Sequence, residues 1–155
     1  MKLQKPVIML LMLIPLLIAF YALKNQSQEK PEGIIAAKIG NRTYNLEVSD
    51  NDEERAQGLS GRKSMDERSG MLFIFQDKEI RSFWMKEMYF PLDFIWLDDD
   101  LIVDLSENIP PPKNGDTSNL EIITPLKPVD KVIELNSGQI SKMNLKIGDK
   151  IEFID

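Results

Sequence analysis

The chain has 155 residues, with 19 Lys and Arg against 25 Asp and Glu, and it contains neither cysteine nor histidine. Without thiols there is no disulfide, no cysteine nucleophile, no lipid-modified cysteine and no cysteine-based zinc site. Without imidazoles there is no Ser-His-Asp catalysis and no His-bearing zinc or iron site. We therefore expect no cofactor, and any chemistry must come from carboxylates, Lys, Arg, Tyr, hydroxyls or the backbone.

The first 23 residues are expected to form a membrane anchor. The run from Pro6 to Leu23 holds no charged residue over 18 positions, and a helix of that length spans about 27 Å, close to the ~30 Å hydrocarbon core. A cleaved signal peptide is the alternative, because Lys2 and Lys5 would form its positively charged n-region. Against cleavage, Phe20 and Tyr21 stand where a signal-peptide cleavage site needs small residues. Both interpretations send the C-terminal part across the membrane, so we expect a single-pass or secreted extracytoplasmic protein.

Residues 24–33 are polar, with Pro31 and Gly33, and are expected to be a linker between the anchor and one β-rich domain at 34–155. Beyond residue 23 the chain holds 17 basic and 25 acidic side chains, which gives a net charge of −8. That charge repels a phosphate backbone, so no nucleic-acid partner is expected.

Apolar segments and turn signals alternate along 34–155 in the rhythm of a compact antiparallel β-sandwich or barrel. Gly40-Asn41 indicates a two-residue hairpin, and Asp98 to Asp100 the tip of another. Strands are expected at 34–39, 42–48, 71–76, 80–87, 93–97, 101–106, 131–135 and 150–154.

Two short helices and one long loop complete the expected domain. Asp50 is predicted to cap a helix that ends at Gly58, because acidic residues crowd its first turn. A second helical turn is expected at 137–143, with Ser137 as its cap. Residues 109–128 contain three consecutive prolines and an Asn-Gly pair, so they are predicted to form a long loop outside the sheet.

Aromatic residues concentrate in one 24-residue window, which is expected to supply the core of the domain. The window contains Phe73, Phe75, Phe83, Trp84, Tyr89, Phe90, Phe94 and Trp96. Within a strand at 80–87, Trp84 and Lys86 would share one face. An indole beside a lysine at the edge of an aromatic block is what the mouth of a ligand pocket offers.

A series of ordered motifs resembles a known family. They are Arg55 to Arg62 (RAQGLSGR), Gly70 to Phe75 (GMLFIF), Phe83 to Lys86 (FWMK), Pro91 to Asp93 (PLD), Val132 to Leu135 (VIEL) with Gly138, and Gly148-Asp149. The set is similar to the bacterial and archaeal family called domain of unknown function 192. The resemblance implies a β-rich sandwich or barrel behind a signal or anchor segment, without an established activity. Where the family usually reads Phe-Trp-Met-Lys-Asn-Thr, this chain has Glu87 and Met88.

The polar residues of these motifs, Arg62, Lys86, Asp93 and Glu134, together with Trp84, are the candidate ligand-binding residues. One interpretation is a set of ion pairs that pins loop ends. Another is a cleft in which Lys86 and Arg62 hold a small anionic or glycan ligand over Trp84. A third is a hydrolase of envelope glycans that uses Asp93 and Glu134 as acid and base.

We expect a binding or accessory module of the cell envelope rather than an enzyme. The carboxylate-based hydrolase stays an alternative, and so does a structural domain that docks an envelope protein. Asp98 to Asp100 could suggest calcium, but a strand follows at once without the glycine and distal glutamate of an EF-hand loop, so no metal site is expected.

Overall fold

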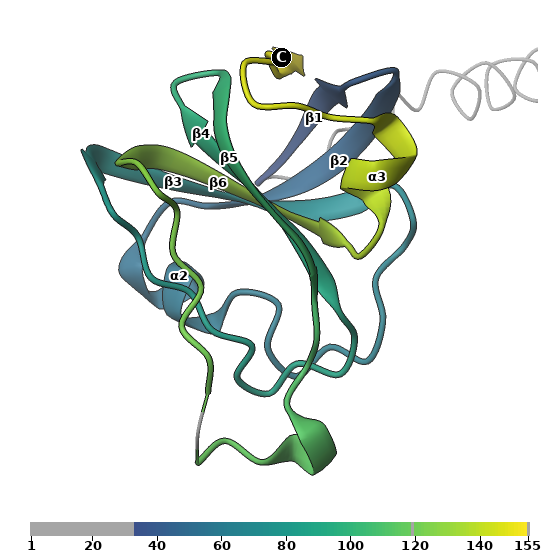
Figure 1. The fold of residues 1–155 in the computed structure, drawn as a ribbon, viewed down its shortest axis with the longest axis vertical. Helices are drawn as coiled ribbons and strands as arrows, with labels where there is room; N and C mark the ends of the chain where they lie inside the picture. The colour runs from purple at the N-terminus through teal and green to yellow at the C-terminus, as the bar shows by residue number, and fades with distance from the viewer. Residues whose placement is uncertain (1–32, 119, 155) are drawn as a thin grey trace, which may run out of the picture. The chain divides into compact units, whose positions relative to one another are not determined.

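Seven strands form a single curled sheet in this computed structural model, which describes residues 33–118 and 120–154 (Figure 1). In chain order the elements are β1 (Ile34–Ile39), β2 (Arg42–Ser49), α2 (Asp52–Gln57), β3 (Ser69–Glu79), β4 (Leu92–Asp98), β5 (Leu101–Ile109), the 3-10 turn η1 (Lys113–Gly115), β6 (Val129–Asn136), α3 (Gln139–Met143) and β7 (Glu152–Ile154). The strand order is β5-β4-β6-β3-β2-β1-β7. The expectation of a mainly β domain with two short helices is confirmed.

The sheet curls until its two ends meet at one corner. The N–H of Ile102 in β5 donates to the carbonyl of Asp149 (2.9 Å), and the N–H of Gly148 donates to the carbonyl of Ile102 (2.8 Å). The segment before β7 therefore lies alongside the first strand in the order, and the sheet is a half-barrel. Of the two architectures left open by the sequence, a sandwich or a barrel, the single curled sheet corresponds to the barrel type and not to a sandwich of two sheets.

One pair of neighbouring strands departs from the antiparallel expectation. β2 and β3 run parallel, with Asn45 opposite Ser69 and Ser49 opposite Phe73. A parallel neighbour needs a crossover, and the chain between the two strands supplies it through α2. The expected turns are present, since Gly40-Asn41 joins β1 to β2 and Asp99 lies at the tip between β4 and β5.

The two faces of the sheet carry separate cores, because successive side chains of a strand point to opposite sides. The inner core fills the curl and is closed by α3; it comprises Ala37, Ile39, Tyr44, Leu46, Leu72, Ile95, Leu97, Ile102, Ile133, Leu135, Ile140, Leu145 and Ile151. The outer core lies on the other face under the loops; it comprises Leu59, Met71, Phe73, Met85, Met88, Leu92, Phe94, Trp96, Val103, Ile123, Val129 and Val132. In Figure 1, α2 and α3 lie on opposite sides of the sheet.

The prediction of a strand at 80–87 is wrong, because these residues form a loop between β3 and β4. β3 continues to Glu79, and beyond it only Phe83 makes a ladder contact, with Ile123 of the long loop. The apolar residues that suggested a strand are indeed buried against the outer core, but they lie on a loop that crosses it. Met85 and Met88 point from this loop into the outer core. The loop ends in a turn at Glu87, whose backbone is left-handed, with φ of 56°.

Both predicted helix caps are one position away from the observed ones. The amide of Glu54 donates to the side chain of Asn51 at 3.0 Å, so Asn51, not Asp50, caps α2. α3 begins after Gly138 without a side-chain cap, and the Ser137 hydroxyl instead contacts Asn108 (2.5 Å). Gly58 ends α2 as expected.

The predicted membrane segment at 1–23 and most of the predicted linker lie outside the described residues. Within the described residues, neither short helix has the length or the apolar run needed to span a bilayer. From Gly33 onward the described chain forms one compact unit.

Candidate functional site

Glu134 is an acidic side chain placed in the outer core. Its neighbours across the sheet are Met71 of β3 and Phe94 of β4, which lie on the same face. Glu134 is only 5% exposed, and no described residue forms a hydrogen bond or ion pair with its carboxyl group. Burial raises the pKa of Glu134 to about 8, although the positive charge of Arg62 opposes the shift. The carboxyl group is therefore mostly protonated at neutral pH.

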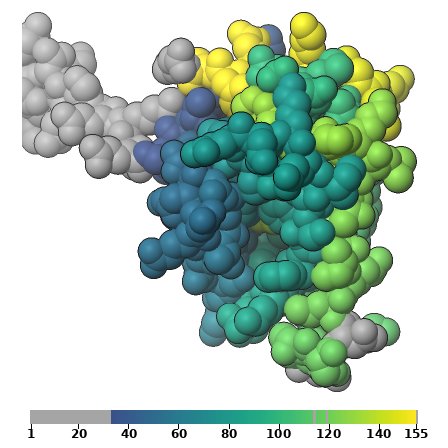
Figure 2. Space-filling model, turned by 90° about the vertical axis from the view of Figure 1, so that its left-hand side faces the viewer, coloured from purple at the N-terminus to yellow at the C-terminus, as the bar shows by residue number. Residues whose placement is uncertain are grey.

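A pocket of about 390 Å³ lies over Glu134, and we call it the aromatic pocket. Its wall is made of the segment from α2 to Ser60, the end of β3 and the loop that follows β3. The lining residues are Arg55, Ala56, Gln57, Gly58, Leu59, Ser60, Phe73, Phe75, Ile80, Arg81, Ser82, Phe83, Trp84, Met88, Leu92 and Glu134. On the face in Figure 2, the surface is hollowed between the blue α2 segment and the teal loop after β3.

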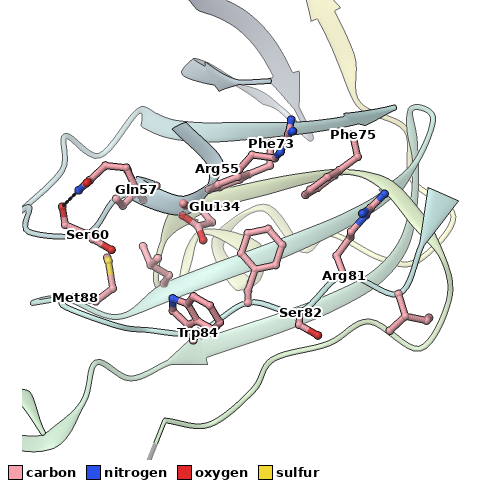
Figure 3. Close-up of a pocket in the computed structure, with 16 residues that line it drawn as sticks. Arg55, Gln57, Ser60, Phe73, Phe75, Arg81, Ser82, Trp84, Met88 and Glu134 are labelled. Carbon is pink, nitrogen blue, oxygen red and sulfur yellow. Dashed lines mark hydrogen bonds between the residues drawn. The ribbon is translucent and has the colours of Figure 1, made fainter. Parts of the chain in front are cut away.

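Aromatic rings form the floor and one wall of the pocket (Figure 3). Phe83 packs edge-on against Phe73, with 5.0 Å between ring centroids, and against the buried Trp96, with 5.5 Å. Trp84 is 52% exposed, in contrast to the fully buried Trp96. An indole half in solvent at the mouth of a pocket offers a flat apolar surface that a ligand can cover.

Two arginines stand at the far end of the pocket on either side of one ring. The guanidinium carbons of Arg55 and Arg81 lie 5.3 Å and 4.1 Å from the centroid of Phe75. Arg55 also donates to the carbonyl of Ile74 at 2.8 Å. The cation–π contacts hold both side chains along the pocket wall instead of in solvent.

Two hydrogen bonds fasten the opposite walls together. The Ser60 hydroxyl donates to the carbonyl of Lys86 at 3.0 Å, and the N–H of Gly61 donates to the carbonyl of Glu87 at 2.9 Å. These bonds explain why the 84–88 turn is ordered over the outer core. Because Glu87 has a positive φ, which asparagine tolerates better than glutamate does, the asparagine usual in the resembled family suits the backbone here.

Comparisons with known proteins agree with this fold. The family model DUF192, described as Uncharacterized ACR, matches residues 35–153. The chain belongs to the DUF192 family. A crystal structure from Sinorhizobium meliloti 1021, described as a putative transcription regulator, has a TM-score of 0.65 at 32% identity and covers 77% of this chain and 91% of its own. A protein of unknown function from Novosphingobium aromaticivorans DSM 12444 has the same TM-score at 24% identity and covers 77% and 83%. The search of curated proteins finds no match.

Of the five residues predicted for the site of this DUF192 protein, two line the aromatic pocket, namely Trp84 and Glu134. Arg62 does not line it, because both of its terminal nitrogens bind the carboxylate of Glu47, at 2.5 and 2.7 Å. This pair raises the pKa of Arg62 and lowers that of Glu47. Lys86 is exposed and contributes only its backbone carbonyl to the fold around the pocket.

Asp93 lies on the other face of the sheet. It pairs with Leu135 of the inner core, whereas its neighbour Phe94 pairs with Glu134. Asp93 is fully buried, and its carboxylate oxygens accept backbone N–H groups of Asn108 at 2.8 Å and Ile140 at 2.9 Å. Asp93 and Glu134 therefore cannot flank one scissile bond, and the acid and base pair of the hydrolase hypothesis is not assembled.

Sequence reasoning missed the arginine end of the pocket and its polar rim. Arg55 opens the RAQGLSGR motif but was not among the candidate residues, and nothing in the pattern brings it to Phe75. Arg81 stood in a predicted strand that does not form. Gln57 and Ser82 complete the rim and carry no signal that separates them from other surface residues.

Two lysines form ion pairs at the acidic tip formed by Asp98 to Asp100 and the neighbouring Asp130. The carboxylates of Asp98, Asp99 and Asp130 lie close together. Lys78 contacts Asp98 and lies 2.9 Å from Asp99, and Lys131 lies 3.4 Å from Asp130. The ammonium groups of Lys78 and Lys131 therefore already supply positive charge next to these carboxylates.

Proposed function

We propose that this DUF192 protein binds a small ring-bearing molecule in the aromatic pocket, with Trp84 as the platform and Glu134 at the base. The observation that carries the proposal is the carboxyl group of Glu134, which is buried, has no partner among the described residues and faces an open cavity. The carboxyl oxygens are not sealed within the protein but reach the pocket, so a ligand that displaces water there must supply a hydrogen-bond partner for them. Such a group is typical of a functional site.

The size and lining of the pocket support a ligand of one or two rings. Its volume of about 390 Å³ lies within the usual range for small-molecule sites, about 300 to 1,000 Å³. Aromatic walls with a few polar groups are the usual composition of such sites.

The competing functions have less support. A glycan hydrolase of the two-carboxylate type needs a second acid beside Glu134, and Asp93 faces away. A role in transcription, suggested by the description of the Sinorhizobium structure, would need a basic surface, whereas residues 24–155 carry a net charge of −8.

The binding test uses the 155-residue chain and a library of one- and two-ring fragments, followed by two-dimensional NMR of the tryptophan indole N–H groups. The two tryptophans give an internal comparison, because Trp84 lies in the pocket and Trp96 donates to Ser106 in the interior. We expect fragments to shift the Trp84 signal more than the Trp96 signal.

Trp84→Ala is expected to weaken binding of any fragment found in this way at least about tenfold, or about 1.4 kcal/mol, because the platform is lost; isothermal titration calorimetry measures this affinity, since the variant lacks the Trp84 signal. The melting temperature should hardly change, since the ring is half in solvent. Tyr89→Ala is the matched control, because Tyr89 is 63% exposed and does not line the pocket. Equal effects of the two substitutions would contradict the proposal.

We propose further that residues 1–23 anchor the protein in the membrane and hold the binding domain in the cell envelope. The support is the uncharged run at 6–23 with lysines on both sides. The chain should remain in carbonate-washed membranes with an intact N-terminus, and protease added to spheroplasts should digest its C-terminal part. Recovery in the cytosol would contradict the anchor, and a shortened N-terminus would favour a cleaved signal.

A further inference from the structure

We infer that the ligand of the aromatic pocket is an uncharged, oxygen-rich ring, of the saccharide class, and that Glu134 donates a hydrogen bond from its protonated carboxyl group to one of the ligand's oxygens. The inference rests on the proposed function and narrows it from small molecules in general to one chemical class. Three features of the pocket support it. They are the protonation of the Glu134 carboxyl group, the balance of charges around Arg55 and Arg81, and the polar atoms of the rim that have no partner among the described residues.

The surroundings of Glu134 favour the neutral acid as the form that meets the ligand. Arg62 is the positive charge that acts on Glu134, but its two terminal nitrogens are bound to Glu47, so it does not form an ion pair with Glu134. Lys86 and Glu87, on the turn that covers the outer core, are exposed and do not line the pocket. A protonated carboxyl group donates one hydrogen bond and accepts others, whereas a carboxylate only accepts. An ether, hydroxyl or carbonyl oxygen is therefore its natural partner.

The arginine end does not provide an anion site. Arg55 is bound to Asp52 at 2.6 Å, and Arg81 contacts both Asp77 and Glu79. Two guanidinium groups thus face three carboxylates, and the end of the pocket carries no surplus positive charge. A carboxylate or phosphate ligand would have to displace one of these pairs, and the buried Nε of Arg81, which has no partner, is not accessible to it.

The rim offers further hydrogen bonds that a purely apolar ligand would not use. The amide nitrogen of Gln57 donates to the carbonyl of Ser60 at 3.1 Å, which leaves the amide oxygen of Gln57 to accept (Figure 3). The hydroxyl of Ser82 is exposed and has no hydrogen bond with another described residue. A sugar ring matches this arrangement, because it presents an apolar C–H face to the indole of Trp84 and hydroxyl groups around its edge.

The first test compares matched probes on the 155-residue chain by titration of the Trp84 signal at pH 7. The probes are neutral methyl glycosides and disaccharides, the corresponding uronic acids, and the corresponding sugar phosphates. Neutral sugars should bind, and each acidic partner should bind at least several-fold more weakly. Tighter binding of the uronic acids or phosphates would overturn the inference, and so would binding of aromatic fragments without any binding of sugars.

The second test measures how the affinity of a neutral sugar depends on pH. If the protonated carboxyl group is the donor, affinity should fall about tenfold between pH 7 and pH 9, since the pKa of Glu134 is about 8. Glu134→Gln keeps a donor and an acceptor at the same place, so its affinity should be the same at both pH values. Glu134→Leu should weaken binding at every pH. An equal pH dependence in the wild type and in Glu134→Gln would overturn the role of this carboxyl group.

The two proposals fail in different ways. If no fragment of any class shifts the Trp84 signal, the binding function itself is wrong. If fragments bind at Trp84 but neutral sugars do not, the binding function stands and only the saccharide inference is lost.

Discussion

Asp93→Ala is expected to lower the free energy of unfolding by about 4 kcal/mol, because two buried backbone donors lose their acceptor at once. The carboxylate of Asp93 accepts the N–H of Asn108 near the end of β5 and the N–H of Ile140 in α3. It is fully buried, so water does not replace it without opening the fold. Asp93→Asn should cost about half as much, because its single amide oxygen can serve only one of the two donors.

Urea denaturation followed by circular dichroism measures both effects. Asp100→Ala is the control, since Asp100 lies exposed at the tip between β4 and β5 and should change stability by no more than about 0.5 kcal/mol. Ligand affinity of the folded Asp93→Asn protein should match that of the wild type, because Asp93 lies on the face opposite the pocket. If Asp93→Asn instead abolished binding and left stability unchanged, the structural role assigned to Asp93 would be wrong.

The contrast between Asp93 and Glu134 shows what the sequence could and could not predict about the site. Both residues stand in apolar strand segments, and both were candidate ligand-binding residues. The alternation within β4 places Asp93 and Phe94 on opposite faces, which is visible in the sequence. That Phe94 lies opposite Glu134 depends on how β4 pairs with β6, and strand pairing is a long-range choice that local pattern does not contain.

The fold was more predictable than the site, because its signals are local. The Gly40-Asn41 turn, the acidic tip after β4 and the breaks at Gly58 and in the proline run lie within a few residues of the structures that they determine. The parallel pairing of β2 with β3 was missed, because it depends on the crossover through α2 and not on either strand alone. The same crossover brings Arg55 to Phe75, so the error in topology and the missed end of the pocket have one cause.

The loop after β3 was misread for a different reason. Alternation of apolar and polar residues indicates one buried face, but a loop that lies flat on an apolar surface shows the same alternation as a strand. Phe83 and Met85, two positions apart, both pack on the outer core, whereas the ladder contact of this loop is confined to Phe83 with Ile123. The mistake matters for function, because Trp84 is exposed at the pocket mouth as a consequence of this loop and not of a sheet edge.

Glu134→Gln is expected to stabilise the fold at neutral pH, the reverse of what substitution of a buried residue usually does. The pKa of Glu134 in the folded state is about 8, above the ordinary value of 4.5. The folded protein therefore holds this proton more tightly than the unfolded chain, and its stability falls as the pH rises from about 4.5 to about 8. At pH 7 the loss is about 3 kcal/mol, and the glutamine variant, which does not titrate, avoids it.

Unfolding curves of the wild type and of Glu134→Gln, measured from pH 4 to pH 8, check this result. The two proteins should have similar free energies of unfolding at pH 4. As the pH rises above 4, the variant should become steadily more stable than the wild type. Glu121→Gln, at an exposed position, should follow the wild type throughout. A constant difference between Glu134→Gln and the wild type at all pH values would mean that Glu134 does not titrate as a buried acid.

If the gain in stability is found and the sugar affinity of the variant is retained at pH 9, the ionisation of Glu134 limits both stability and binding.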